Sequence, residues 1–304
     1  MTIAAYGSEA RPAGRLSGQL LVVAAAVLWS SCGLFVKMPI FDAWPAGERG
    51  IVLAFWRALF AASLLAPMVR RPRWRPALLP LGLIFAAMSA TYLAAMSLTT
   101  AANAIWLQST APWWVFCIGV LLLRERVARR DLVPLAFGVL GVGVILAFEL
   151  RGQARLGVVF GLLAGLCYAG VVLLLRRLRA ESTVWVVTVC HASTAALLLP
   201  WAVWLGVWPT GWQWLALVAF GGLQIALPYV LLARALRTIS SQEAMGIALL
   251  EPVLTPLWSF AVRGEVPAVW TIVGAGLILT GLVLRYFLMP RFLSDAVVAE
   301  KSKA

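Results

Sequence analysis

The chain has 304 residues, of which 62% are hydrophobic and only 12% charged, and its mean hydropathy is +0.93. Soluble domains carry about twice this fraction of charged residues, so a water-soluble globular protein is excluded and lipid must cover most of the surface. The formal net charge of +13 would suggest nucleic acid as a partner of a soluble protein. Here the basic residues stand in short loops between apolar runs, so we expect membrane lipid and no nucleic acid as the partner.

Ten apolar runs, bounded by Arg, Pro, Gly or Asp, are each long enough to cross a bilayer, which takes roughly 20 residues of helix. They predict an all-α membrane protein with transmembrane helices near residues 19–38, 50–69, 77–97, 101–123, 131–149, 157–175, 183–206, 212–234, 242–262 and 267–289. The polar stretches 1–18 and 290–304 are then tails. No processing site follows the basic residues before the first span, so we expect no cleavable signal peptide.

The basic residues predict the orientation, because cytoplasmic loops of membrane proteins carry an excess of Lys and Arg. One side of the membrane receives only Lys37, Arg49, Arg151, Arg155 and Arg263. The other side collects the larger set, Arg11, Arg15, Arg70, Arg71, Arg73, Arg75, Arg124, Arg126, Arg129, Arg130, Arg176, Arg177, Arg179, Arg234, Arg237, Arg285, Arg291, Lys301 and Lys303. We therefore expect both termini in the cytoplasm.

The second half of the chain repeats the first at an offset of 140 residues. The matched pairs are Trp74 and Trp214, Gly82 and Gly222, Pro112 and Pro252, Glu125 and Glu265, and Gly141 and Gly281. Five spans per half is an odd number, which turns the halves upside down relative to one another. Inverted repeats are typical of alternating-access transporters. We expect two five-helix repeats, at 19–149 and 150–289, around a central cavity.

The run ATYLAAMSLTTAANAIWLQSTAPWWVFCIGVLLLRERVARRDLVPLAFGVLGVGVIL resembles the half-unit of the EamA family, in the drug/metabolite transporter superfamily. AFWRALFAASLL, with Arg57, resembles the family's second helix. The family commonly has glycine before the glutamate at the helix end; Gly264 precedes Glu265, whereas Glu125 lacks it. The opening helix VLWSSCGLFVK is similar to that of bacterial aromatic amino-acid exporters. The resemblance implies an exporter in a bacterial inner membrane.

The fourth span carries a polar and aromatic stripe on one helix face, formed by Asn103, Trp106, Thr110, Trp113 and Cys117. One interpretation is a cavity wall that stacks and hydrogen-bonds a substrate, with Gln108 meeting the substrate's polar backbone. The other is helix–helix packing, with Asn103 as an end cap. Pro112 lies beside the stripe and is a candidate hinge, because proline removes a backbone hydrogen bond.

Glu251 precedes Pro252 near the middle of the ninth span, where an ionisable group is costly and by default suggests function. Three roles are open: binding a substrate ammonium, carrying a coupled proton, or pairing with another side chain as a gate. His191, in the seventh span, is a candidate partner, although a structurally satisfied histidine is the favoured interpretation. Arg57 is expected to snorkel to the interface, with a carboxylate partner as the alternative.

Other candidates for a substrate path are Trp29, Tyr92, Tyr168, Gln224 and Tyr229. Trp29 and Tyr168 occupy equivalent positions in the two halves, and core packing is the favoured interpretation for both. Pro228 breaks the eighth span next to Tyr229. It and Pro252 are candidate hinges, although simple kinking explains Pro228 equally well.

Three smaller patterns predict packing rather than chemistry. Gly157, Gly161 and Gly165 form a GxxxG ladder that predicts close helix approach. The cysteines lie in apolar segments without metal-type spacing, so we expect small buried hydrophobes at Cys32, Cys117, Cys167 and Cys190. Tryptophans at span ends are expected to be interfacial anchors, namely Trp44, Trp74, Trp201, Trp204, Trp208, Trp212, Trp214 and Trp270.

The sequence contains no HExxH, paired-cysteine or phosphate-loop motif, so we expect no enzyme, no cofactor and no metal. The hypothesis is a monomeric transporter that exports small metabolites, above all amino acids and particularly aromatic ones. The alternative within transport is export of other organic compounds, including cationic drugs. From a different class, an intramembrane enzyme or a lipid-handling protein stays open, as does the choice between proton coupling and uniport.

Overall fold

The structure is a computed structural model that describes residues 12–121, 132–150 and 154–284. Within these ranges it is helical and contains no strand. The helices are α1 Pro12–Ser30, α2 Cys32–Val36, α3 Arg49–Leu65, α4 Leu78–Leu98, α5 Ala101–Gln108, α6 Ala111–Leu121, α7 Leu132–Glu149, α8 Arg155–Arg177, α9 Thr183–Leu205, α10 Trp212–Gly221, α11 Leu227–Ala235, α12 Ser241–Ala248, α13 Leu250–Arg263 and α14 Val269–Val283.

These helices form the predicted spans, several of them as consecutive pairs. In the described residues, nine helical stretches are long and apolar enough to cross a membrane, and α14 is a shorter apolar helix. The first span starts earlier than predicted, because α1 begins at Pro12 and its apolar stretch at Arg15. The predicted N-terminal tail, residues 1–18, therefore includes residues that belong to α1. Glu125 and the predicted C-terminal tail lie outside the described residues.

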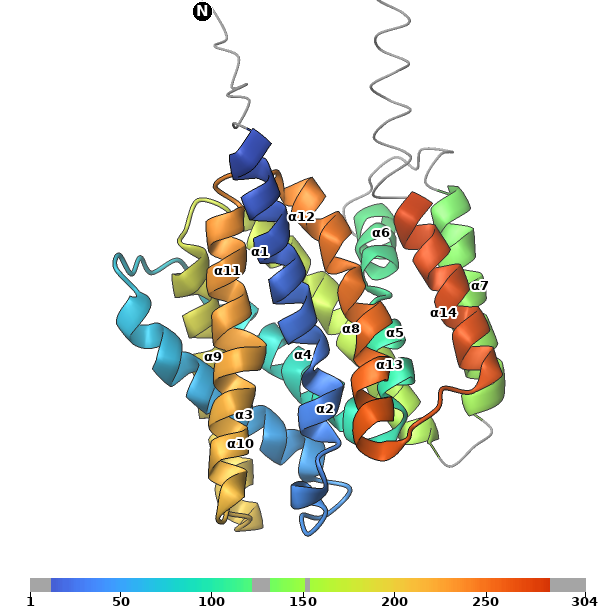
Figure 1. The fold of residues 1–304 in the computed structure, drawn as a ribbon, viewed down its shortest axis with the longest axis horizontal. Helices are drawn as coiled ribbons and strands as arrows, with labels where there is room; N and C mark the ends of the chain where they lie inside the picture. The colour runs from blue at the N-terminus through green and yellow to red at the C-terminus, as the bar shows by residue number, and fades with distance from the viewer. Residues whose placement is uncertain (1–11, 122–131, 151–153, 285–304) are drawn as a thin grey trace, which may run out of the picture.

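The fourth and ninth spans begin alike and run in opposite directions. Thr100 caps α5 by accepting from the Asn103 N–H, and Ser240 caps α12 by accepting from the Glu243 N–H. Such hydroxyl caps satisfy the first free N–H groups of a helix. In Figure 1, α5 leads upward into α6, whereas α12 leads downward into α13. The two five-helix repeats are thus inverted.

Each half completes the packing of the other. The first helix of each half packs on the third and fourth spans of the opposite half, so α1 contacts α11, α12 and α13, and α8 contacts α4, α5 and α6. The predicted glycine ladder of α8 makes this approach close: a Cβ on Gly157 would meet Thr99, one on Gly161 would meet Leu107, and one on Gly165 would meet Thr110. The equivalent helices α3 and α9, and α7 and α14, pair directly.

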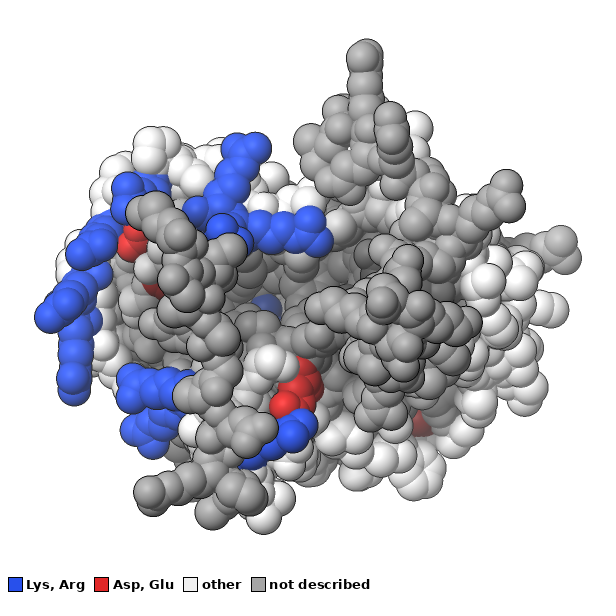
Figure 2. All heavy atoms as spheres, turned by 90° about the horizontal axis from the view of Figure 1, so that it is seen from above, with Lys and Arg blue, Asp and Glu red and all other residues white. Residues whose placement is uncertain are grey.

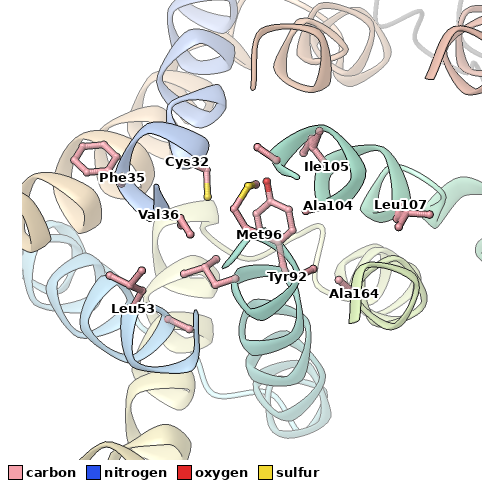
Figure 3. Close-up of a cluster of buried hydrophobic side chains, with 14 of the residues drawn as sticks. Cys32, Phe35, Val36, Leu53, Tyr92, Met96, Ala104, Ile105, Leu107 and Ala164 are labelled. Atoms are coloured by element: carbon pink, nitrogen blue, oxygen red, sulfur yellow. The ribbon is translucent and has the colours of Figure 1, made fainter. Parts of the chain in front are cut away.

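The main core lies where α2, α3, α4 and α5 meet. Figure 3 shows Cys32 of α2 pointing toward Tyr92 and Met96 of α4. Cys32 and Cys190 are buried thiols as predicted, whereas Cys117 and Cys167 are only half-buried. The predicted interfacial role of Trp44 is wrong, because its ring packs 4.8 Å from that of Phe41 and is 5% exposed.

The other predicted anchor tryptophans are exposed, with 37% to 79% of the side-chain surface accessible at Trp74, Trp201, Trp204, Trp208, Trp212, Trp214 and Trp270. Their indole rings thus remain available to the membrane interface, where tryptophan is enriched.

Candidate functional site

Arg57 lies near the middle of α3 and is buried, with 4% of its surface exposed. Its Nη2 donates to Ser89 Oγ at 2.7 Å, and its Nη1 donates to Gln224 Oε1 at 3.4 Å. Its guanidinium carbon lies 5.3 Å from the centre of the Phe220 ring, within the range of a cation–π contact. The expected snorkelling of Arg57 is therefore wrong: side chains of two other spans, the third and the eighth, hold the guanidinium inside the bundle.

Gln224 reaches Arg57 from an irregular part of the eighth span. The chain widens into a π-helical turn over Gly222–Ala226, just before Pro228. Proline has no N–H to give to the carbonyl four residues earlier, and π-turns often mark functional sites. The side-chain amide of Gln224 donates to the Trp29 carbonyl at 3.1 Å while its oxygen faces Arg57. Gln224 therefore links α1 to α3.

Glu251 is the second charge at the centre of the bundle. It is the second residue of α13 and interacts electrostatically with Arg57, Cys32, Tyr92 and Tyr229, all of which lie inside the bundle. The Glu251 side chain is partly exposed. Its carboxylate has no ion-pair partner among the described residues. We call Arg57, Ser89, Gln224 and Glu251 the central polar cluster.

Aromatic side chains from both halves stand beside this cluster. The rings of Trp29 and Tyr229 meet edge to face with centroids 5.2 Å apart. Tyr168 of α8 interacts electrostatically with Tyr229 and is 37% exposed. Tyr92 is buried next to Cys32, with which its hydroxyl interacts. Sequence reasoning favoured core packing for Trp29 and Tyr168; the structure brings both to the partly exposed aromatic group around Tyr229.

The side chains of the fourth-span stripe do not take part in the central polar cluster and instead contact neighbouring helices. Asn103 is fully buried, donates to Thr99 Oγ1 at 3.1 Å and accepts from Thr271 Oγ1 at 2.8 Å. Trp113 donates to the Pro134 carbonyl at 3.0 Å, and a Cβ on Gly138 would collide with its ring.

The rest of the stripe follows the same pattern. Thr110 donates to the Leu107 carbonyl and accepts from Trp114. Trp106 lies in an apolar groove between α5, α13 and α14. These contacts correspond to the packing interpretation of the stripe.

Two predicted site residues, His191 and Gln108, form no hydrogen bond with the central polar cluster within the described ranges, although His191 interacts electrostatically with Arg57. His191 is fully buried on α9, with its ring edge against Phe85 at 5.0 Å. Neither of its ring nitrogens has a hydrogen-bond partner, so the expectation of a structurally satisfied histidine is wrong. Gln108 is half-buried and ends α5, just before the break at Ser109 and Thr110.

One end of the bundle, lowest in Figure 1, is tied together by charges from both halves. Lys37 Nζ lies 2.9 Å from Glu265 and donates to the Thr99 carbonyl, and Glu265 also accepts from the Ala101 N–H at the start of α5. Asp42 pairs with Arg49 at 3.0 Å and with Arg263. We call Lys37, Asp42, Arg49, Arg263 and Glu265 the end cluster.

The end cluster joins elements that would have to separate if this end opened. It connects the segment after α2, the starts of α3 and α5, and the loop that follows α13. The hydrogen bond from Arg263 holds the pKa of the Asp42 carboxyl below its usual value, with the positive charges of Arg263 and Arg49 adding to the effect. The Asp42 carboxylate is therefore ionised and paired near neutral pH.

The opposite end carries the predicted excess of basic residues. Figure 2 shows Lys and Arg side chains gathered over this face. Its exposed basic residues, within the described ranges, are Arg15, Arg70, Arg71, Arg73, Arg75, Arg176, Arg177, Arg179, Arg234 and Arg237. Only two ion pairs in the described residues tie this face, Arg15 to Glu243 and Arg75 to Glu181. We call it the basic face.

A family comparison decides what kind of protein has this geometry. The sequence model of the EamA-like transporter family matches the chain twice, over residues 16–147 and 155–287. This chain belongs to the EamA-like transporter family. The family has two repeats of five helices, and each copy covers one of the two inverted halves. An EamA-like protein is a membrane transporter and not an enzyme.

Relatives of this EamA-like transporter extend along nearly its whole length. An uncharacterized transporter of Archaeoglobus fulgidus is 29% identical over 272 residues, covering 88% of this chain and 96% of the relative. The pseudopaline exporter CntI of Pseudomonas aeruginosa strain UCBPP-PA14 is 26% identical, covering 88% and 95%. A solved crystal structure shares the fold with a TM-score of 0.59 and 22% identity, covering 90% of this chain and 98% of the other.

In this EamA-like transporter, sequence reasoning found Glu251, Gln224 and the aromatic residues but underrated Arg57. Its partners Ser89, Gln224 and Phe220 come from the third and eighth spans, so the spacing around Arg57 could not reveal them. The available signal was the position of Arg57 near the middle of an otherwise apolar span, which is the same signal that singled out Glu251.

Proposed function

We propose that this EamA-like transporter moves small amphoteric metabolites, amino acids above all, by alternating access through the central polar cluster. The observation that carries the proposal is the position of charged, polar and aromatic side chains from both halves at one mid-span depth. Groups of this kind are costly inside a membrane and mark substrate pathways. The aromatic rings supply stacking surfaces, so aromatic amino acids are the favoured substrates.

The proposed resting arrangement is closed at the end cluster and accessible from the basic face. Five charged side chains bind the two halves together at the end cluster, whereas the basic face carries only two ion pairs in the described residues. By the excess of basic residues, the basic face is the cytoplasmic one. Export then consists of binding from the basic face, closure there and opening of the end cluster.

Prolines are proposed to provide the hinges of this cycle. The fourth span breaks at Ser109 and Thr110, before Pro112, and the ninth breaks at Leu249, before Pro252. The π-helical turn before Pro228 is a third irregular point. The eighth and ninth spans carry Gln224 and Glu251, and the fourth span packs against the ninth through α5 and α13, so bending at these points would move one half against the other. We place the protein as a monomer in a bacterial inner membrane, with both termini in the cytoplasm.

The test is counterflow in liposomes that contain the purified full-length chain. Vesicles loaded with one unlabelled amino acid at millimolar concentration are diluted into the same amino acid carrying a radiolabel, for each of the 20 protein amino acids (a standard set). Protein-free liposomes give the background. We expect transient accumulation of at least one amino acid, with aromatic ones strongest.

Counterflow of ethidium alone, with none of the amino acids accumulating, would overturn the proposed substrate class in favour of cationic compounds. Repeating the assay with and without a pH gradient separates proton coupling from uniport. A pH gradient that changes accumulation of the same amino acid indicates coupling, and an unchanged accumulation indicates uniport.

A further inference from the structure

The guanidinium of Arg57 is held by neutral groups only. An arginine has five N–H donors, and the contacts of Arg57 go to Ser89 Oγ, Gln224 Oε1 and, at 3.9 Å, Cys32 Sγ. Its Nε is buried and has no hydrogen-bond partner. Within the described ranges no carboxylate forms an ion pair with Arg57. The cation is thus oriented but not neutralised.

An oriented cation without a counterion is an expensive feature at this depth. Charged side chains inside a membrane are normally paired, because desolvation otherwise costs several kcal/mol. The nearest anion is Glu251, which interacts with Arg57 without reaching ion-pair distance. Two opposite charges that interact with one another, neither of them in an ion pair with a described residue, match the two charges of a zwitterion.

We infer that Arg57, held by Ser89 and Gln224, is the subsite for the carboxylate of the transported substrate. The inference rests on the proposed transport function and deepens it by naming the substrate class: small zwitterions with a free carboxylate. The unpartnered Nε–H and the remaining Nη–H supply donors of the kind that bind carboxylate in two parallel hydrogen bonds. Glu251 then faces the substrate's ammonium group, and Trp29 and Tyr229 stand beside its side chain.

The surroundings of Arg57 support a binding role over a purely structural one. Ser89 and Gln224 are both buried and fix two edges of the guanidinium, while Phe220 stacks beside it, so little side-chain freedom is lost when a carboxylate arrives. A structural arginine would be expected to have its donors satisfied by carbonyls or carboxylates of the protein. Here the Nε–H is left without any acceptor.

The first test uses Gln224→Glu, which places a resident carboxylate beside Arg57. If Arg57 awaits a carboxylate, this variant should raise the melting temperature in detergent by about 3 °C and reduce amino-acid counterflow at least tenfold, because the subsite is occupied. Gln213→Glu is the matched control, since Gln213 is a buried glutamine near the start of the same span whose amide donates to the Ile40 carbonyl. The control should not raise the melting temperature.

A second test compares L-phenylalanine with L-phenylalaninamide and phenethylamine, which lack the free carboxylate. We expect L-phenylalanine to raise the melting temperature of the wild-type chain. In Arg57→Lys, the same rise should need at least tenfold more L-phenylalanine. Neither analogue should raise the melting temperature of either protein. Equal stabilisation by the acid and the amide, or a lower melting temperature for Gln224→Glu, would overturn the carboxylate subsite.

Failure of the proposed function gives a different result. If no amino acid accumulates in the counterflow panel, the transport proposal fails for this substrate class, while the melting temperature of Gln224→Glu still reports whether Arg57 lacks an anion. If amino acids accumulate, but Arg57→Lys changes the stabilisation by L-phenylalanine and by L-phenylalaninamide equally, the transport proposal stands and the carboxylate subsite does not.

Discussion

The fourth and ninth spans have the same outline and different uses. Both begin with a hydroxyl cap, break before a proline and end near a glutamate of the repeat. They differ in burial, because 56% of the most apolar stretch of the fourth span is buried but only 22% of that of the ninth span. In the fourth span, Asn103 and Trp113 form hydrogen bonds with residues of neighbouring spans. In the ninth, the carboxylate of Glu251 forms no ion pair with any residue that the structure describes.

The difference shows that equivalent positions in the two repeats carry different kinds of side chain. Glu251 aligns with Ala111, Gln224 with Ile84 and Arg57 with Leu197 at the repeat offset of 140. The charged and amide groups of the central polar cluster thus have apolar counterparts in the other half. One copy of the helix supplies scaffold, and the other supplies the ionisable group, while the inverted pairing of the halves brings Arg57 and Glu251 together.

The largest expected effect comes from removing the scaffold of the fourth span. Trp113→Ala deletes a ring that is 6% exposed and a hydrogen bond to Pro134, and it should lower the free energy of unfolding by about 3–5 kcal/mol. Trp212→Ala, at a ring that is 79% exposed, is the control and should change it by less than about 0.5 kcal/mol. Denaturant titration in mixed micelles measures both. Similar losses for the two variants would contradict the scaffold role.

The ninth span should show the reverse behaviour. Glu251→Gln removes the charge that faces the substrate ammonium, so amino-acid exchange should fall about tenfold, equivalent to roughly 1.4 kcal/mol, with the melting temperature little changed. Glu243→Gln is the control, because Glu243 lies at the start of the same span and binds Arg15 and Gln19. Exchange that survives in Glu251→Gln while its pH dependence disappears would assign Glu251 to proton transfer instead.

The end cluster should control opening more weakly. Lys37→Met removes a pair whose side chains are 16% and 18% exposed, so a stabilisation of roughly 1 kcal/mol or less is at stake. We expect an impermeant thiol reagent to label Val36→Cys up to fivefold faster when Lys37→Met is added, since Val36 is only 1% exposed. Arg15→Met, which breaks a pair on the basic face, should leave that rate unchanged. An unchanged rate in Lys37→Met would remove the gating role.

The smallest expected effect is the acid sensitivity of Asp42. Because its folded-state pKa lies below the usual value, its ion pairs stabilise the protein above about pH 4 and lose this effect as the pH falls through the folded-state pKa. The melting temperatures of the wild type and Asp42→Asn should differ by about 2 °C or less between pH 5 and 8. That difference should shrink as the pH falls below about 4, and a difference that grows on acidification would argue against the role of the Asp42 ion pairs.

The sequence alone predicted the fold well because its signals are local or periodic. Span length, the loop arginines and the offset of 140 residues each follow from neighbouring or regularly spaced positions. Gly157, Gly161 and Gly165 likewise predicted the close contact of α8, because small residues at helical spacing have few other uses in a span.

The site was only partly predictable, because its contacts join distant spans. The stripe of the fourth span left both packing and a cavity wall open, because the sequence does not show the partners of Asn103 and Trp113, which are Thr271 on α14 and Pro134 on α7. Arg57 was assigned to the interface because span depth alone cannot show whether a side chain meets lipid or protein. Glu251 was found because a carboxylate at that depth has no ordinary alternative.

Cysteine accessibility tests the contrast between the two spans most directly. In a chain whose four native cysteines are replaced by alanine, Glu251→Cys and Asn103→Cys are each exposed to a small impermeant thiol reagent, with and without L-phenylalanine. The account predicts that Glu251→Cys reacts and is protected by the amino acid, while Asn103→Cys does not react. Labelling of Asn103→Cys with protection, and no labelling of Glu251→Cys, would contradict it.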